Sequence, residues 1–262
     1  MWLQLAQRTA IVTGAGSGIG FQAAKSLLEN KCRVIFADKE MGVMQNATSS
    51  LDSSQCEFQL VKCDVTDPEQ VKNLISEADA FGQEHGASIL VNCAGITRDG
   101  WVTKMSLDDW DTVMDVNLRG TFLTCQAFLE SKRSQDINMG SNGSVGPLGS
   151  SIINIGSVVS EFGNLGQANY AASKGGVVGL TRALAKEMVN QNVRVNAILP
   201  GFIDTPMAQA VPDHVKDQMV KRIPLRRFGQ PSEVADVICF LASPRSSYIH
   251  GEAIRVSGMI SI

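Results

Sequence analysis

The chain has 262 residues, of which 44% are hydrophobic and 19% charged, and its 23 basic against 26 acidic residues give a formal net charge of −3. A chain of this size and composition can bury a full core, so we expect a single α/β domain over residues 1–262. The basic residues are scattered along the sequence, which argues against nucleic acid as a partner. No apolar run approaches the roughly 18 residues that span a bilayer, and the first expected strand is reached by Thr9, which leaves no room for a signal peptide. We therefore expect no membrane partner.

The cysteines and histidines are spaced as in a protein without a metal site. The six cysteines lie far apart with no CxxC pair, and most fall in or beside apolar runs, as buried free thiols do. This usage fits a reducing compartment. The three histidines are separated from one another and from any cysteine cluster, so zinc has no visible set of ligands and we expect no bound metal.

The first predicted unit is a strand, a turn and a helix, starting at residues 9–20 with the sequence TAIVTGAGSGIG. Apolar residues then recur at Ile19, Ala23 and Leu27, which gives one face of a helix. Glycines let the backbone approach a diphosphate, whose charge is favoured at the amino end of a helix, although glycines also mark ordinary turns. The loop residues expected to hold a dinucleotide are Gly14, Gly16, Ser17, Gly18, Ile19 and Gly20.

Asp38 completes a dinucleotide-binding pattern. It ends the apolar run at 34–37 and follows Gly18 by twenty residues, the distance expected for a carboxylate that binds the adenosine ribose. A carboxylate at this position repels the extra phosphate of NADP, and the loop carries Ser17 rather than a basic residue, so we expect NAD as the cofactor. Lys39 follows immediately and partly screens that repulsion, which keeps NADP as the less favoured alternative. Asp38 could instead cap a helix.

Strands and helices alternate through the rest of the chain. Further strands are expected at 57–61, 89–91, 152–155, 193–199 and 253–256, and helices at 68–81, 107–131, 169–189 and 231–242. This alternation predicts a Rossmann-type doubly wound parallel sheet of about seven strands with helices on both faces. Ligands of such folds gather at the carboxyl ends of the strands. Six residues at or just after expected strand ends should form one rim: Thr13, Asp38, Asp64, Asn92, Ser157 and Pro200.

The segment 134–150 does not fit this alternation. It carries four glycines and four serines, and we expect a flexible insert between a helix and the strand at 152–155. Nothing in its sequence indicates a function.

Tyr170 and Lys174 are the expected catalytic pair. They lie four residues apart in YAASK, with Ser157 thirteen residues upstream at the end of an apolar run. Residues four apart share a helix face, so an ammonium group would lie beside a phenol whose ordinary pKa is about 10. A nearby cation lowers the pKa of a phenol and makes it a better general acid or base. Alternatively, Tyr170 packs on an amphipathic helix and Lys174 is solvated.

These motifs occur in one order along the chain: TGAGSGIG, NCAG at 92–95, Asn117 in VNLRG, Ser157 in INIGS, YAASK, and PG at 200–201. In this order they resemble the short-chain dehydrogenases/reductases from about residue 8 to the end. The stretches AGITRD, IGSVVSEFGNLGQANYAASKGGVVGLT and ILPGFIDTPM are similar to those of 3-oxoacyl-acyl-carrier-protein reductases, and among these to the alpha subunits of mitochondrial 3-ketoacyl reductases.

The resemblance implies a role for each matching residue. Tyr170 would donate or accept the proton, Ser157 would hold the substrate oxygen, Lys174 would bind the nicotinamide ribose, and Asn117 would position a water. The cofactor contacts that it implies beyond the glycine loop and Asp38 are Asp64, Val65, Asn92, Ala94, Gly95, Tyr170, Lys174, Pro200, Gly201, Ile203 and Thr205. Structural alternatives remain open: Asn117 could kink its helix, Asn92 could satisfy a strand end, and Thr205 could precede a helix start.

The resemblance also implies an activity: interconversion of a 3-oxoacyl thioester of coenzyme A or acyl carrier protein and its (3R)-3-hydroxyacyl form. A 17-beta-hydroxysteroid or other secondary-alcohol dehydrogenase is the first alternative, since the loop expected at 206–228 does not specify a substrate. A non-catalytic NAD-binding subunit is the second. The basic run at 221–229 could meet an acidic carrier or be a solvated face. The family implies a homotetramer, or a heterotetramer with a related reductase subunit, in the mitochondrial matrix; the cytoplasm is the alternative.

Overall fold

The computed structural model describes residues 2–52, 56–138, 149–209 and 213–260. Seven parallel strands form one sheet in the order β3-β2-β1-β4-β5-β6-β7. The strands are β1 (Thr9–Thr13), β2 (Arg33–Asp38), β3 (Phe58–Lys62), β4 (Ala87–Asn92), β5 (Ser150–Ile155), β6 (Val193–Pro200) and β7 (Ala253–Val256). The predicted seven-stranded, doubly wound parallel sheet is confirmed.

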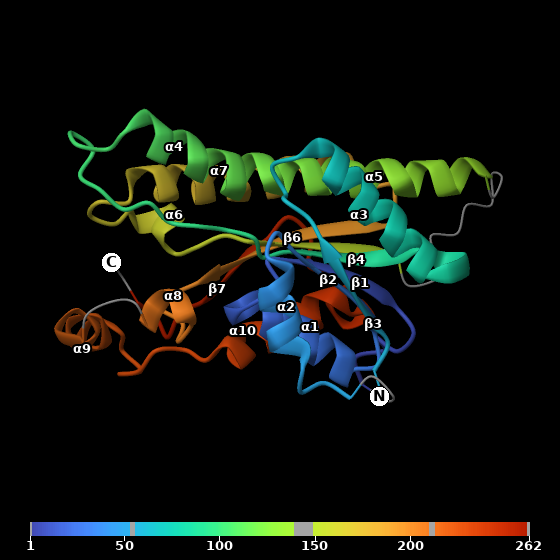
Figure 1. Ribbon diagram of the computed structural model, residues 1–262, viewed down its shortest axis with the longest axis horizontal. Coiled ribbons are helices and arrows are strands. Elements are labelled where there is room, and N and C mark those ends of the chain that lie inside the picture. Colours follow the sequence, from blue (N-terminus) through green and yellow to red (C-terminus); the bar gives the residue numbers. More distant parts are fainter. Residues whose placement is uncertain (1, 53–55, 139–148, 210–212, 261–262) are drawn as a thin grey trace.

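Helices cover both faces of the sheet (Figure 1). One layer contains α1 (Gly18–Glu29), α2 (Met41–Thr48) and α10 (Pro231–Ala242); the other contains α3 (Pro68–Phe81), α4 (Leu107–Met114), α5 (Gly120–Asn138) and α7 (Ala168–Glu187). The shorter elements are η1 (Gln83–His85), η2 (Asp115–Arg119), α6 (Val159–Phe162), α8 (Pro206–Gln209), α9 (Asp213–Arg222) and η3 (Pro244–Ser246). None of the helices in the described ranges is both long and apolar enough to cross a membrane.

The strands are buried on both sides because successive side chains alternate between two cores. Val12 and Phe36 pack with α1 and α10 in one core, whereas Ile11 and Ile35 pack with α3, α5 and α7 in the other. Every residue of β1 is buried. This two-sided burial explains why the strands read as continuous apolar runs in the sequence.

The structure departs from the expected elements in three places. The expected helix at 107–131 is divided by η2, a π-helical turn, which contains Asn117. The segment expected as a loop at 206–228 contains α8 and α9, and no residue of α9 is fully buried. At the expected insert, α5 continues to Asn138 and β5 begins at Ser150, while 139–148 lie outside the described residues.

Candidate functional site

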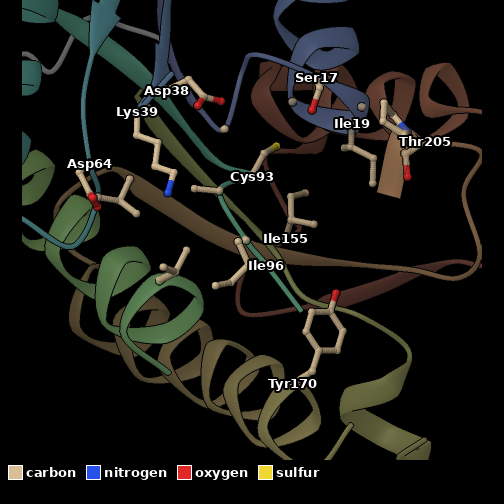
Figure 2. A pocket seen from close by; sticks show the side chains of 18 of the residues that line it. Ser17, Ile19, Asp38, Lys39, Asp64, Cys93, Ile96, Ile155, Tyr170 and Thr205 are labelled. Atoms are coloured by element: carbon tan, nitrogen blue, oxygen red, sulfur yellow. The ribbon is translucent and has the colours of Figure 1, made fainter. Parts of the chain in front are cut away.

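A cavity of about 340 Å³ lies at the carboxyl ends of the strands, beside the point between β1 and β4 where the strand order reverses (Figure 2). Open parallel sheets bind ligands at this position. Its lining brings together residues that are far apart in the sequence. They are Gly14, Ser17, Gly18, Ile19, Gly20, Asp38, Lys39, Cys63, Asp64, Val65, Cys93, Ala94, Gly95, Ile96, Arg98, Thr112, Val116, Ile155, Tyr170, Lys174, Thr205 and Pro206.

The glycine loop between β1 and α1 forms one wall. A Cβ added at Gly20 would lie 2.1 Å from the Gly14 carbonyl oxygen, and one at Gly14, where φ is +64°, would lie 2.8 Å from the Ala94 backbone. Side chains at these two positions would therefore clash with the backbone, and the loop could not keep this conformation. Ser17, the N-cap of α1, makes no side-chain capping hydrogen bond, and the first turn has no acidic residue. The helix terminus thus remains available to an anion and fits the diphosphate of a dinucleotide.

Asp38 forms the wall beside the glycine loop. One of its carboxylate oxygens accepts a hydrogen bond from the Gly16 N–H and the other from the Glu40 N–H, each at 3.1 Å. These bonds fix the carboxylate at the end of β2. The N-cap of α2 is Glu40 rather than Asp38. Lys39 lines the same part of the cavity and extends toward Asp64 (Figure 2).

Asp64 and Val65 line the cavity after β3. Asp64 Oδ1 accepts hydrogen bonds from the Thr66 N–H at 2.9 Å and the Thr66 hydroxyl at 2.8 Å. This turn holds the carboxylate in place. After β4, the Ala94 N–H donates to Thr13 Oγ1 at 3.3 Å, which holds the NCAG segment against the end of β1.

Lys174 lies in the wall opposite the glycine loop. Its side chain is buried, and Nζ donates to the Ile155 carbonyl oxygen at 2.8 Å and lies 5.8 Å from the centroid of the Tyr170 ring. A Cβ added at Gly95 would lie 3.2 Å from this nitrogen. Burial lowers the pKa of Lys174 to about 8, because the charged form loses its hydration, and the Cys93 thiol opposes the shift weakly.

Tyr170 reaches the cavity from the first turn of α7, with its hydroxyl directed into the open space (Figure 2). Burial raises the pKa of its phenol, a hydrogen bond with Ser157 opposes this shift, and the Asp99 carboxylate adds to it. The direction is opposite to the one expected from the spacing of YAASK, because loss of hydration on burial is the largest effect on the phenol. A raised pKa keeps the phenol protonated and makes it a weaker acid than a free phenol.

Ser157 is buried beside this phenol. Its Oγ accepts a hydrogen bond from the Val159 N–H at 3.2 Å and also bonds to Tyr170. The hydroxyl does not line the cavity itself. β5 and α7 therefore bring the two expected hydroxyl groups together, as the spacing of thirteen residues predicted.

Asn117 lies behind the cavity wall and is fully buried. Its Oδ1 accepts from the Ile96 N–H at 2.8 Å, and its Nδ2 donates to the Ile96 carbonyl at 3.0 Å and to Ser173 Oγ at 3.1 Å. Both amide hydrogens are used within the protein. The side chain therefore braces the loop after β4 against α7, and its role in holding a water stays a prediction.

Five other residues predicted to contact the cofactor do not line the cavity: Gly16, Asn92, Pro200, Gly201 and Ile203. The Asn92 side chain lies in the core, where it accepts from the Thr124 hydroxyl at 2.8 Å and donates to Asn154 Oδ1 at 2.9 Å. The Pro200 carbonyl accepts from the Val158 N–H at 3.1 Å. Thr205 does line the cavity, and α8 begins directly after it at Pro206.

Sequence reasoning missed several residues of the lining: Cys63, Cys93, Ile96, Arg98, Thr112, Val116, Ile155 and Pro206. Most are apolar or uncharged and belong to no catalytic pattern. Some could have been predicted from their position in the sequence, because Ile155 ends a strand and Cys63 and Cys93 directly follow one. Arg98 is the one lining residue of this group with a permanent charge.

Two other sequence patterns have structural counterparts. In the basic run at 221–229, Arg227 forms two hydrogen bonds with the carboxylate of Glu233 at 2.7 and 2.6 Å, so this cation is already paired. All six cysteines are free. Within the part of the chain that the structure describes, no group of three or more histidine, cysteine or acidic side chains could hold a metal ion.

The chain matches known proteins over nearly its whole length. The family model described as Enoyl-(Acyl carrier protein) reductase matches residues 14–259. A (3R)-3-hydroxyacyl-CoA dehydrogenase from Mus musculus is 41% identical, covering 98% of this chain and 97% of that protein. The 3-oxoacyl-[acyl-carrier-protein] reductase FabG from Thermotoga maritima is 39% identical, covering 99% and 100%.

A solved structure is similar in fold as well as sequence. It is a crystal structure from Agrobacterium tumefaciens with bound NADP, assigned as a 2-deoxy-d-gluconate 3-dehydrogenase. The TM-score is 0.85 at 31% identity, covering 98% of this chain and 97% of the other. With the parallel sheet, the glycine loop and the Tyr170–Lys174 pair at one cavity, these matches show that the chain belongs to the short-chain dehydrogenase/reductase family of NAD(P)-dependent oxidoreductases.

Proposed function

We propose that the protein interconverts 3-oxoacyl thioesters and their (3R)-3-hydroxyacyl forms with NAD(H) as cofactor. The observation that carries this proposal is that Tyr170 and Lys174 line the same cavity as the glycine loop and Asp38. Relatives at about 40% identity supply the substrate class, since their names specify a (3R)-3-hydroxyacyl-CoA and a 3-oxoacyl-acyl-carrier-protein.

Tyr170 and Ser157 act on the oxygen of the substrate. The bound nicotinamide supplies or takes up a hydride at the substrate carbon. Negative charge then develops on the carbonyl oxygen during reduction, and hydroxyl donors directed at it lower the energy of the transition state. The Tyr170 hydroxyl points into the cavity, whereas the Ser157 hydroxyl, which bonds to Tyr170, would have to turn toward the cavity to reach that oxygen. Tyr170 releases its proton to that oxygen, and takes a proton back when the alcohol is oxidised.

Lys174 supports the tyrosine rather than the substrate. Its Nζ is held by the Ile155 carbonyl within reach of both the phenol ring and the Gly95 backbone. With its pKa lowered to about 8, Lys174 is still mostly protonated at neutral pH but releases its proton more readily than an exposed lysine. We assign it to the ribose next to the nicotinamide and to the return of the proton to Tyr170.

The preference for NAD rests on Asp38. Its carboxylate is fixed by two backbone N–H groups at the wall of the cavity, where it can accept hydrogen bonds from ribose hydroxyls and repel a phosphate. Lys39 lines the same wall and reduces that repulsion. NADP is therefore a usable but weaker cofactor in this proposal.

Assembly and location belong to the proposal on the strength of the family resemblance alone. We assign a tetramer, either of this chain or with a related reductase subunit, and the mitochondrial matrix as compartment. Sedimentation of the purified chain with and without such a subunit would test the tetramer. Imaging of a tagged protein in cells would test the mitochondrial location. A purely monomeric or purely cytoplasmic protein would contradict these assignments.

Initial rates with acetoacetyl-CoA and with estradiol, each with both nicotinamide cofactors, test the proposed reaction. We expect reduction of acetoacetyl-CoA with NADH to give the highest kcat/KM, because Asp38 favours NAD and the relatives act on acyl thioesters. Faster turnover of estradiol would assign a hydroxysteroid dehydrogenase instead. Dinucleotide binding without turnover of either substrate would favour a non-catalytic subunit.

A further inference from the structure

Ser173 lies between Tyr170 and Lys174 on α7 and has no place in the reaction described above. Its side chain is completely buried. Its Oγ donates to the Tyr170 carbonyl at 2.9 Å and accepts the Asn117 Nδ2–H at 3.1 Å. One hydroxyl thus connects the helix turn that carries the catalytic tyrosine to the π-helical turn between α4 and α5.

The Asn117 amide extends this connection to the cavity. Its oxygen and its other amide hydrogen bind the N–H and the carbonyl of Ile96, at 2.8 and 3.0 Å. Ile96 lines the cavity. Because the amide has only two hydrogens, removal of the Ser173 hydroxyl would leave one of them without this acceptor in the protein interior.

The bond to the Tyr170 carbonyl alone would not indicate a special role, since serine and threonine side chains in helices commonly donate to a carbonyl one turn earlier. Thr181, two turns further along α7, shows the same pattern. Its hydroxyl donates to the Val177 carbonyl at 2.8 Å and accepts from Asn154 Nδ2 at 3.0 Å. Neither hydroxyl lines the cavity, and both amide partners are buried. The difference is that Ser173 bonds to the Tyr170 carbonyl and, through Asn117, to Ile96 in the cavity wall, whereas Thr181 bonds to Val177 and Asn154.

We propose that Ser173 is a positioning residue for the reaction at Tyr170: it locks the Asn117 amide against Ile96 and so fixes the loop after β4 relative to the tyrosine. This inference rests on the proposed function for its assay. Without the hydroxyl, the loop and the first turns of α7 would lose one of their shared contacts, while the bond from Asn169 Nδ2 to the Arg98 carbonyl at 2.9 Å would remain. The hydroxyl of Tyr170 would then be less well aligned with the substrate oxygen, and misalignment of this kind lowers kcat more than it weakens binding.

Ser173→Ala tests the proposal, with Thr181→Val as the matched control. We expect Ser173→Ala to lower kcat for acetoacetyl-CoA reduction about tenfold and to leave KM and the NADH dissociation constant within about twofold. Thr181→Val loses the same two kinds of hydrogen bond on the same helix. It should keep kcat within about twofold, while its melting temperature should fall at least as much as that of Ser173→Ala. Ser173→Cys keeps a weak donor and acceptor at nearly the same volume and should give an intermediate kcat.

A double-mutant cycle shows whether the effect passes through Asn117. In an Asn117→Ala background, Ser173→Ala should cause little further loss of kcat. Equal kcat values for wild type, Ser173→Ala and Ser173→Cys would overturn the proposal, and so would equal losses in Ser173→Ala and Thr181→Val. If Ser173→Ala does not fold, the cysteine variant decides by the same criteria.

A measurement without turnover separates this inference from the proposed function. Hydrogen exchange of the Asn117 side-chain amide, followed by NMR, should be slow in the wild type and fast in Ser173→Ala. Fast exchange in the wild type would show that Ser173 does not hold the Asn117 amide and would overturn the proposal. If the wild type turns over neither test substrate but shows slow exchange, the assigned substrate is wrong. The proposed Ser173–Asn117 contact is then still supported.

Discussion

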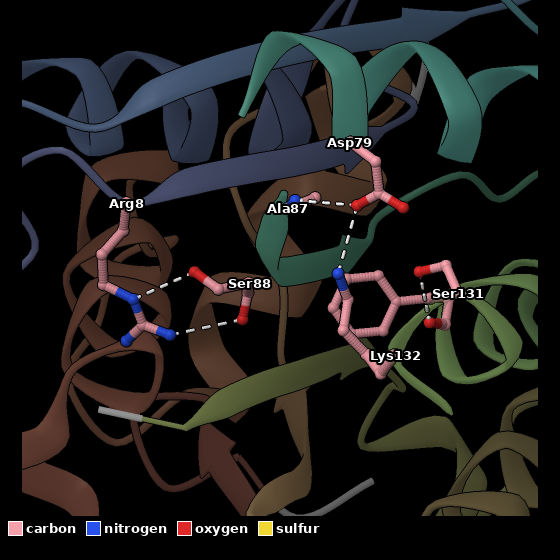
Figure 3. Close-up of polar contacts among 7 residues, drawn as sticks. Arg8, Asp79, Ala87, Ser88, Ser131 and Lys132 are labelled. Carbon is pink, nitrogen blue, oxygen red and sulfur yellow. Dashed lines mark hydrogen bonds and ion pairs between the residues drawn. The ribbon is translucent and has the colours of Figure 1, made fainter. Parts of the chain in front are cut away.

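The two ends of the parallel strands use buried cations in different ways. At the amino ends, Arg8 donates to Ser88 Oγ at 3.1 Å and to the Ser88 carbonyl at 3.3 Å (Figure 3). It also donates to the carbonyls of Gly149 and Ala242 at 2.7 and 2.8 Å. At the carboxyl ends, Lys174 is just as deeply buried, and one carbonyl, that of Ile155, holds its ammonium group. The first cation is saturated by the fold, whereas the second faces a cavity.

A second pair at the amino ends shows the same contrast. Asp79 Oδ1 accepts from Lys132 Nζ at 3.1 Å and from the Ala87 N–H at 2.9 Å, which connects α3, α5 and β4 (Figure 3). These contacts join three elements, and none of these residues lines the cavity at the other edge. The comparison teaches that one edge of the sheet uses polar groups to fix the fold, and the other keeps their hydrogen-bonding capacity for a ligand.

Tyr170→Phe should produce the largest effect. Loss of the phenolic hydroxyl removes the proton donor, so kcat should fall by about 10³-fold or more. Because the ring remains and the glycine loop is untouched, the NADH dissociation constant should change by less than about twofold and stability should hardly change. Stopped-flow rates, fluorescence titration and thermal melting measure the three quantities. Unchanged turnover would remove Tyr170 from the mechanism.

Arg8→Met should show the opposite pattern at the other edge. The variant leaves three carbonyl groups without their charged donor, which destabilises the folded protein. Part of this loss of stability is offset, because burial of the charge is itself unfavourable and lowers the pKa of Arg8 to about 10. We expect the free energy of unfolding to fall by roughly 2–4 kcal/mol. The kcat of the folded protein should stay within about twofold. Urea denaturation and active-site titration provide the measurements, and a stable variant with impaired kcat would contradict the division between the edges.

Lys174→Met should stabilise the protein at neutral pH while it reduces activity. A pKa lowered from 10.5 to about 8 corresponds to a cost of roughly 3 kcal/mol for burying the charge, and loss of the bond to Ile155 offsets about 1 kcal/mol of the gain. The net gain should therefore be about 2 kcal/mol below pH 8.

The stability difference between Lys174→Met and the wild type should change sign with pH. Below pH 8 lysine is charged in both the folded and the unfolded protein, so the full cost is present; between pH 8 and 10.5 the folded form is neutral first and the cost fades. Above pH 10.5 only the lost hydrogen bond remains, and the variant should be the less stable protein. Urea denaturation across this range checks the crossing, and a pH-independent difference would refute a buried charge at Lys174.

The sequence was sufficient for the parts of the molecule that repeat a simple physical pattern. The continuous apolar strands and the four-residue spacing of Tyr170 and Lys174 predicted the sheet and placed both side chains at one cavity. The raised pKa of Tyr170 was not predictable, because it depends on burial and on Asp99, which approaches from a different loop. The same holds for the interruption of the helix at Asn117, whose bonds to Ile96 join residues 21 positions apart.

The amino edge was almost invisible in the sequence. Arg8 stands alone before the first strand, and its acceptors lie 80, 141 and 234 positions away. Three of these four acceptors are backbone carbonyls, which carry no side-chain signal. The residues of the catalytic rim carry chemistry that can be recognised from their side chains, whereas a structural contact of this kind is specified only by the folded chain.

Asp38→Ser should have the smallest effect, and it probes how far the carboxyl edge depends on charge. The change removes the carboxylate near the expected 2′ position of the ribose, so the kcat/KM ratio of NADPH to NADH should rise about tenfold, equivalent to about 1.4 kcal/mol. Both cofactors should bind more weakly, since the Gly16 N–H loses its acceptor. Lys39→Met is the matched control: it removes the neighbouring cation and should lower the same ratio. If both variants moved the ratio in one direction, the wall would select the cofactor by shape rather than by charge.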